Sequence, residues 1–160
     1  MKTDNKKTGN RGEDLATEFL GNKGYLILER NFRTRFGEID IVCLDGEILV
    51  FVEVKTKKGH DFGEPEEMVN KSKLAQVQRM GEVFVELKNS KTQSAQKSCS
   101  RVPDSGKPRM DMTARDFLLH SSVSDFLTRK WNGRCRVDVV GVVLNEDLSV
   151  ERIRHFGAVY

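Results

Sequence analysis

An aspartate, a glutamate and a lysine stand in the order D-x12-E-x-K, as Asp40, Glu53 and Lys55. Glu53 and Lys55 directly follow the apolar run at residues 48–52, which is typical of a strand buried on both faces. Charged side chains in such a place are costly unless they are paired or bind a metal ion. A divalent cation such as Mg²⁺ that is held by carboxylates can bind a scissile phosphate and activate a water, and a nearby lysine can stabilise the developing charge. The pattern therefore favours metal-assisted hydrolysis of a phosphodiester bond.

The two acids are predicted to lie on neighbouring antiparallel strands. Strand patterns cover residues 36–44 and 47–56, and the Asp45-Gly46 pair between them is a strong signal for a two-residue hairpin turn. Side chains alternate between the two faces of a strand, so the register of this hairpin decides which charges share a face.

A turn centred on Asp45-Gly46 pairs Leu44 with Glu47 and sets the rest of the register. Asp40 then lies opposite Phe51 and Glu38 opposite Glu53, with Lys55 on the same face. Asp40 and Glu53 become diagonal neighbours, with Cα atoms about 7–8 Å apart. Opposed carboxylates repel, and a divalent cation between them would relieve that repulsion.

Two other interpretations of this acidic face stay open. The charges can simply decorate a solvated face, although Val42, Leu49 and Phe51 share the face and favour a covering helix. The face can also be structural. In that case Glu53→Gln would stabilise the fold in EDTA, and Mg²⁺ would leave the melting temperature unchanged.

Two predicted helices supply further charged candidates. A helix from residue 10 or 11 to about residue 22 places Glu13 at the edge of its apolar stripe, where it either faces the sheet or complements the helix dipole. A second helix is predicted to begin near Pro65. Lys73 lies within its apolar stripe and either snorkels to solvent or supplies charge to the acids.

The remaining pattern predicts one α/β domain over residues 10–160, after a flexible basic tail at residues 1–9. The expected order is αβββαβ, with a mixed sheet of about five strands flanked by helices. A polar, Ser- and Lys-rich insertion is predicted at residues 88–130. The other expected elements are strands at 25–31, 135–144 and 149–156 and a short helix within 114–131.

Composition narrows the function classes only slightly. The 160 residues include 27 basic and 24 acidic side chains, a mild excess that suits nucleic acid without indicating it. Three cysteines without CxxC spacing argue against a disulfide scaffold and a zinc site. Without a long apolar run or a secretory signal, we expect a cytoplasmic protein that does not bind membranes.

Four basic residues flank the hairpin and are candidate phosphate contacts: Arg33, Arg35, Lys57 and Lys58. Each of them is equally consistent with a solvated surface charge. These candidates make nucleic acid the expected partner.

Several motifs together resemble the YraN-like family of small bacterial proteins. They are GNRGEDLATEFLGNKGY, GEIDIV, VFVEVKTKK, MVNKSK and CRVDVV, and the resemblance covers residues 9–87 and 134–144. GEID followed by VFVEVK is a specific pair. The YraN-like family belongs to the PD-(D/E)xK nuclease superfamily and is related to archaeal Holliday junction resolvases.

The resemblance implies a restriction-endonuclease-like core and a metal-dependent nuclease, with branched or otherwise structured DNA as a candidate substrate. Asp40 and Glu53 match the metal-binding acids of the motif, and Glu13 matches the acid of the first helix. Lys55 matches the catalytic lysine, and Lys73 a lysine of the second helix. Mg²⁺ or Mn²⁺ is the implied cofactor, and a homodimer is compatible with the family.

This chain also departs from the family pattern. Ile39 replaces the proline of the superfamily motif, Val137 replaces a phenylalanine, and most members lack the insertion at residues 88–130. Asp138 matches a strand residue that we expect to be structural. The alternative function is a nucleic-acid-binding or scaffold protein that keeps the nuclease fold without turnover.

Overall fold

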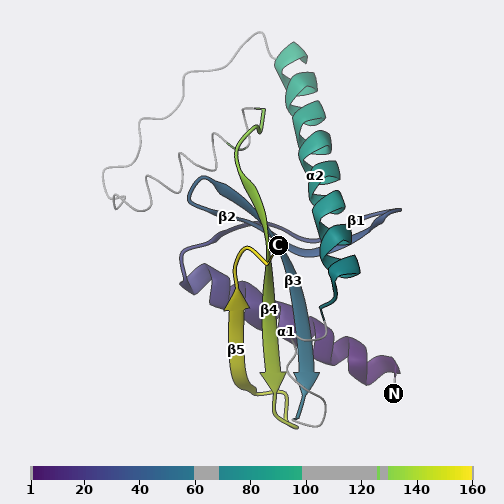
Figure 1. Ribbon diagram of the computed structural model, residues 1–160, viewed down its shortest axis with the longest axis vertical. Helices are drawn as coiled ribbons and strands as arrows, with labels where there is room; N and C mark the ends of the chain where they lie inside the picture. Colours follow the sequence, from purple (N-terminus) through teal and green to yellow (C-terminus); the bar gives the residue numbers. More distant parts are fainter. Residues whose placement is uncertain (1, 60–68, 99–125, 127–129, 160) are drawn as a thin grey trace. The chain divides into compact units, whose positions relative to one another are not determined.

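The computed structural model describes residues 2–59, 69–98, 126 and 130–159, and these form an α/β protein on a mixed five-stranded sheet (Figure 1). This confirms the predicted fold class. The elements are α1 (Lys2–Asn22), β1 (Leu26–Thr34), β2 (Gly37–Asp45), β3 (Ile48–Lys58), α2 (Lys71–Ser98), β4 (Cys135–Leu144) and β5 (Val150–Phe156). None of the helices described combines the length and the apolar character needed to cross a membrane.

The chain divides into two compact units. Met1–Gly81 and Arg134–Tyr160 form the first unit, which holds α1, the whole sheet and the first turns of α2. Glu82–Gly133 forms the second, in which the Phe126 ring stacks on Phe84 with centroids 6.4 Å apart. The predicted insertion lies in the second unit, but its first residues continue α2 to Ser98. The helix expected within 114–131 falls almost entirely outside the described residues.

The first helix starts earlier than predicted. α1 begins at Lys2, so residues 2–9 are helical rather than a flexible tail. Hydrophobic periodicity cannot indicate these turns because their side chains are polar, and the buried apolar stripe starts only at Leu15. α2 begins at Lys71, where Asn70 caps it: the Asn70 side-chain Oδ1 accepts the Lys73 N–H at 2.8 Å. The helix start predicted near Pro65 lies outside the described residues.

The sheet has the order β1-β2-β3-β4-β5, with β3 and β4 parallel and the other neighbours antiparallel. β3 and β4 are the almost continuous apolar runs that a strand covered on both faces requires. α1 covers the face that carries Val50, Val52 and Val54. On the other face, Gly81 of α2 approaches the Phe51 ring so closely that a Cβ there would overlap it.

The hairpin register is two residues away from the predicted one. Leu44 pairs with Leu49 instead of Glu47, and Phe51 lies opposite Val42 instead of Asp40. Gly46 is the first central turn residue, with a φ of 57° that suits the turns joining hairpin strands. A shift by two residues keeps every side chain on its predicted face, so the error changes partners but not faces.

Gly12 sets how closely α1 approaches β3, because a Cβ at this position would overlap the Thr56 side chain. We therefore expect Gly12→Ala to destabilise the fold by about 1–3 kcal/mol through overpacking. Gly9→Ala is the matched control, since a Cβ there meets nothing within 4 Å, and helix propensity should stabilise this variant by about 0.5–1 kcal/mol. Urea denaturation measures both, and equal effects of the two substitutions would contradict the close α1–β3 contact.

Asp138 is fully buried and fastens the last residues of the chain to the sheet. It accepts hydrogen bonds from Arg136 Nε at 3.0 Å and from the Ala158 N–H at 3.0 Å, and it pairs with His155 Nε2 at 2.9 Å. Burial alone would raise the pKa of Asp138, but the bonds from His155 and Arg136 outweigh it and lower that pKa. These contacts give Asp138 a structural role, and Arg136 links it to Asp45 at 2.9 Å.

Candidate active site

The main-chain pairing of β2 with β3 stops where the charged residues begin. Ile41 and Val52 are the last pair of this ladder, and beyond them the Val54 N–H donates to Asp40 Oδ2 at 2.7 Å. The Asp40 side chain thus accepts the main-chain hydrogen bond that a carbonyl of the neighbouring strand would otherwise accept. Asp40 and Glu53, each one residue beyond the last pair, meet at the opening between the two strands.

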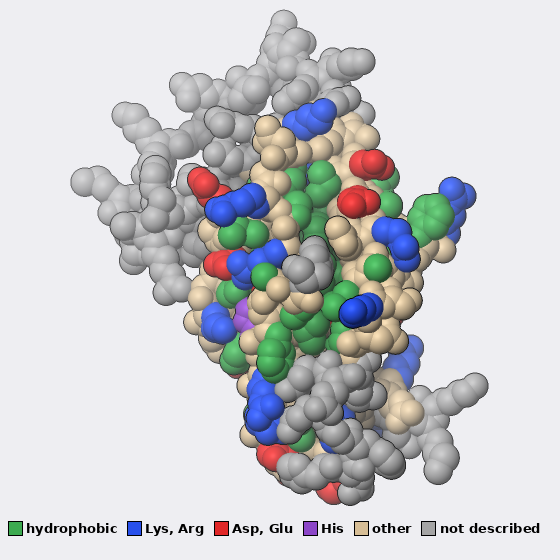
Figure 2. All heavy atoms as spheres, in the orientation of Figure 1, with side chains coloured by type: hydrophobic (Ala, Val, Ile, Leu, Met, Phe, Trp, Pro, Cys, Tyr) green, Lys and Arg blue, Asp and Glu red, His purple; other side chains and the backbone are tan. Residues whose placement is uncertain are grey.

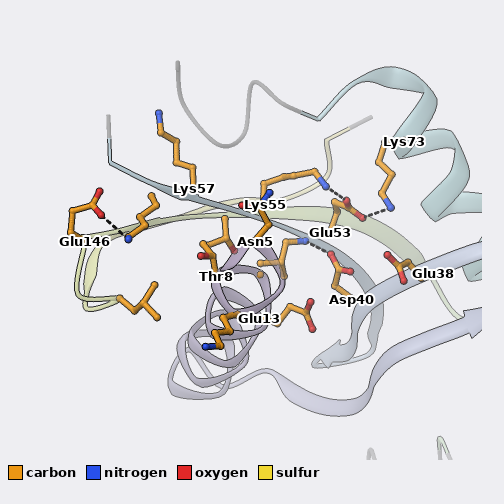
Figure 3. Close-up of a pocket in the computed structure, with 16 residues that line it drawn as sticks. Asn5, Thr8, Glu13, Glu38, Asp40, Glu53, Lys55, Lys57, Lys73 and Glu146 are labelled. Atoms are coloured by element: carbon orange, nitrogen blue, oxygen red, sulfur yellow. Dashed lines mark hydrogen bonds and ion pairs between the residues drawn. The ribbon is translucent and has the colours of Figure 1, made fainter. Parts of the chain in front are cut away.

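Glu53 is only 1% exposed and lies between two lysines (Figure 3). Its Oε1 is 2.5 Å from Lys55 Nζ, and its Oε2 is 3.1 Å from Lys73 Nζ. The Lys73 contact is an ion pair without hydrogen-bond geometry, so the buried Oε2 atom accepts no hydrogen bond within the protein. Two ammonium groups offset the cost of burying the carboxylate, and one of its oxygens keeps unused acceptor capacity.

Asp40 has a strongly perturbed carboxyl group. Burial, then the nearby charge of Glu53 and that of Glu13, raise its pKa from 3.8 to about 7, against the opposing effects of the Val54 hydrogen bond and of Lys73. The nearby lysine therefore does not fully offset the burial of Asp40 and its repulsion by the Glu53 and Glu13 carboxylates. A bound cation would supply the missing positive charge.

Glu13 reaches the same place from the opposite face of the sheet. It belongs to α1, which covers the Val52 face, yet it lines one cavity with Asp40 and Glu53 because β2 and β3 separate there. Its Oε2 accepts the Asn31 side-chain N–H at 2.9 Å, and Asn31 adopts a positive φ of 54° in β1. Asn31 therefore holds the Glu13 carboxylate in position.

All five residues predicted to be catalytic line this cavity, which has a volume of about 810 Å³. They are Glu13, Asp40, Glu53, Lys55 and Lys73, and they come from α1, β2, β3 and α2. A cavity of this size, with carboxylates and ammonium groups converging on one end, is a suitable place for an anionic substrate and a cation.

The predicted phosphate contacts divide into two pairs. Lys57 and Lys58 line the cavity, and Lys58 Nζ also lies 2.6 Å from Glu146. Arg33 and Arg35 are not among the residues described as lining it: Arg35 packs over the Phe36 ring. On the face shown in Figure 2, the described Lys and Arg side chains are spread among other residues rather than gathered in one patch.

Arg33 instead pairs with Glu38, at 3.0 Å from Nε to Oε2. In the observed β2–β3 register Glu53 comes next to Asp40 rather than to Glu38, so the predicted opposition of Glu38 and Glu53 is wrong. On its other side, Glu38 lies opposite Arg33 in the β1–β2 ladder. Repulsion between those two residues therefore gives no argument for a cation. The argument rests on Asp40 and Glu53.

Sequence reasoning missed the part of the cavity that the first turns of α1 provide. Asn5, Lys7, Thr8 and Gly9 line it, in the stretch that was expected to be a tail. A signal was present, because Asn5, Thr8, Gly9, Gly12 and Glu13 recur at helical spacing and are all small or polar. Such a stripe indicates a helix face turned toward a polar ligand or a close neighbour rather than toward a core.

The donor set suits a hard divalent cation in type and charge, because it consists of carboxylate oxygens. Asp40 and the unsatisfied Oε2 of Glu53 are the donors at the opening, with Glu13 as the third acid of the cavity. Within the described residues no three acidic, histidine or cysteine side chains are grouped closely enough to hold a metal as they stand. A cation between Asp40 and Glu53 would compete with Lys73 for Oε2.

A family model described as an uncharacterised protein family, UPF0102, matches residues 12–84. A UPF0102 protein of Desulforamulus reducens is 33% identical over 156 residues, which are 97% of this chain and 96% of that protein. The chain belongs to the UPF0102 family. A UPF0102 protein of Dictyoglomus turgidum is 46% identical over 84 residues, 52% of this chain and 71% of its own length.

UPF0102 membership confirms the YraN-like resemblance. The matched residues 12–84 contain the five predicted catalytic residues, whereas most of the second unit lies outside that match. The relative from D. reducens matches across nearly the whole chain, so this longer form recurs in another UPF0102 protein. UPF0102 is described as uncharacterised, and membership therefore assigns no activity.

Proposed function

We propose that this UPF0102 protein is a metal-dependent nuclease that hydrolyses DNA phosphodiester bonds. One observation carries the proposal: Glu53 is buried between Lys55 and Lys73, beside Asp40, whose pKa is raised to about 7. A protein is often just as stable when apolar residues replace a buried ion pair, so stability alone explains this arrangement poorly. A lysine and two acids of perturbed charge in a cavity are typical of a catalytic site.

The residues have distinct roles in this mechanism. Asp40 and Glu53, with Glu13, would hold Mg²⁺ or Mn²⁺, which supplies Lewis-acid polarisation of the phosphate and lowers the pKa of a bound water. Lys55 lies beside Glu53, where its ammonium group orients the water or stabilises charge on the phosphate in the transition state. Lys73 pairs with the second oxygen of Glu53 and offsets the cost of burying that carboxylate.

Binding of nucleic acid without cleavage is the second candidate, and one observation favours it. Both oxygens of Glu53 already face a lysine, so the site holds together without a cation. The purely structural interpretation loses support from the same contacts. Glu53→Gln would leave Lys55 and Lys73 without their carboxylate and should destabilise the fold rather than stabilise it.

The proposal is tested by cleavage of labelled DNA and by thermal melting. The wild type should cut at least one of duplex, single-stranded, flap and four-way-junction DNA with Mg²⁺ or Mn²⁺ and none of them in EDTA. Metal at a hundred times its dissociation constant should raise the free energy of unfolding by about 2.7 kcal/mol. DNA binding with neither cleavage nor a metal-dependent shift would favour the non-catalytic alternative.

A further inference from the structure

The cavity extends well beyond the acids, along one edge of β3. Six consecutive residues of β3, 53–58, line it. Successive side chains point to opposite faces, so a cavity lined by six residues in a row follows the edge of the strand rather than a face. β4 pairs with these residues along the other edge, and β2 has already left the ladder after Ile41.

The first turns of α1 form the wall opposite this edge. Asn5, Thr8 and Gly9 lie on the same helix face as Gly12, whose contact with Thr56 holds α1 close to β3 (Figure 3). Lys7 also lines the cavity. We call the space between residues 5–9 of α1 and residues 53–58 of β3 the β3-edge groove.

Charge changes sign along the β3-edge groove. Asp40 and Glu53 lie at one end, with Lys55 and Lys73 beside them. Lys57 and Lys58 lie farther along β3, with Lys7 on the wall formed by α1. Glu146, which also lines the cavity, pairs with Lys58, so three lysines meet one described carboxylate at that end. Five steps of about 3.3 Å separate residues 53 and 58, so the groove is roughly 16 Å long. At about 3.4 Å per nucleotide along one strand of a duplex, this length accommodates at most about five nucleotides.

We propose that the β3-edge groove binds one unpaired nucleic-acid strand through its phosphates. Lys7, Lys57 and Lys58 contact the strand and lead it to Asp40 and Glu53, and only cleavage there rests on the proposed function. The whole cavity that contains the groove has a volume of about 810 Å³, within the range of about 300–1,000 Å³ for pockets that enclose a small ligand. A few nucleotides of one strand can enter a space of this size, whereas a duplex would have to stay outside it.

Phosphate recognition follows from the composition of the groove. No aromatic side chain is among the described residues that line it, so stacking on bases contributes little and sequence preference should be weak. Val54 and Leu148 are its apolar side chains in the part of the chain that the structure describes. Two apolar side chains offer few contacts to an extended peptide, which would need apolar sites for its side chains along the strand edge.

The test is binding of a fluorescent oligothymidine to the full chain in EDTA, where metal-dependent cleavage is switched off. We expect the single strand to bind at least about tenfold more tightly than a blunt duplex of the same length. Lys7→Ala and Lys57→Ala should each weaken binding by about threefold and lower the slope of log Kd against log salt by about 0.7. Lys6→Ala is the matched control, because Lys6 is exposed and lies outside the lining.

Three results would overturn the inference: equal affinity for duplex and single strand, equal effects of Lys6→Ala and Lys7→Ala, or equally tight binding of a polyglutamate peptide. Circular dichroism establishes that the variants are folded. Strand binding by a protein that never cleaves would contradict the proposed nuclease and leave the groove supported. Cleavage by a protein that binds duplex more tightly than single strands would support the proposed nuclease and contradict the proposed role of the groove.

Discussion

Asp40→Asn and Glu53→Gln are each expected to reduce DNA cleavage by at least about a thousandfold, which corresponds to about 4 kcal/mol of transition-state stabilisation. Both substitutions keep the size of the side chain but remove the charge that a divalent cation needs. Asp40 and Glu53 meet at the opening between β2 and β3, and the other described acids that line the cavity are Glu13, Glu38 and Glu146. Single-turnover cleavage of the preferred substrate measures the loss.

Matched controls separate this effect from a general change in charge. Glu18→Gln and Asp14→Asn remove the same charges from exposed positions of α1, where Asp14 pairs with Arg30 at 2.7 Å. Both control variants should cleave like the wild type. Cleavage by Asp40→Asn at the wild-type rate, with its fold intact, would remove Asp40 from the mechanism.

Asp40→Asn is also expected to stabilise the metal-free protein at pH 8, by about 2–4 kcal/mol. The pKa of Asp40 rises from 3.8 to about 7 on folding, and each pH unit of such a shift corresponds to about 1.4 kcal/mol. An acid whose pKa is raised on folding costs no stability at a pH below the pKa that it has in the unfolded chain. The penalty grows as the pH rises from about 4 to about 7 and is complete above that.

Urea denaturation in EDTA at several pH values measures this penalty. The difference between Asp40→Asn and the wild type should be near zero at pH 4 and reach its full size at pH 8. Asparagine can still accept the hydrogen bond that the Val54 N–H donates, so the comparison isolates the charge. A difference of the opposite sign at pH 8, or one that does not vary with pH, would show that Asp40 is not held near unfavourable charge.

The two expectations describe one trade-off at Asp40. The negative charge that costs stability without metal is the charge that would bind the cation, so Mg²⁺ should stabilise the wild type more than Asp40→Asn. A protein whose acids are placed for stability alone would show no such exchange.

Local pattern was sufficient to predict the strands and the faces of their side chains. The apolar runs that end at Val52 and begin at Val139 identified the buried strands β3 and β4, because strands covered on both faces are almost continuously apolar. Alternation placed Asp40, Glu53 and Lys55 on one face. That conclusion survived the wrong register, since a shift by two residues preserves the face.

Tertiary packing decided the features that local pattern does not encode. The turn at Gly46 set the register, and the separation of β2 from β3 beyond Val52 let Glu13 reach the acids from the opposite face. The pairing of Lys73 with Glu53 depends on where α2 lies against the sheet. The polar first turns of α1 line a cavity instead of a core and so carry no apolar period. Hydrophobic periodicity indicates which apolar side chains an element buries, whereas this site is built from charged and polar side chains that several elements bring to one opening.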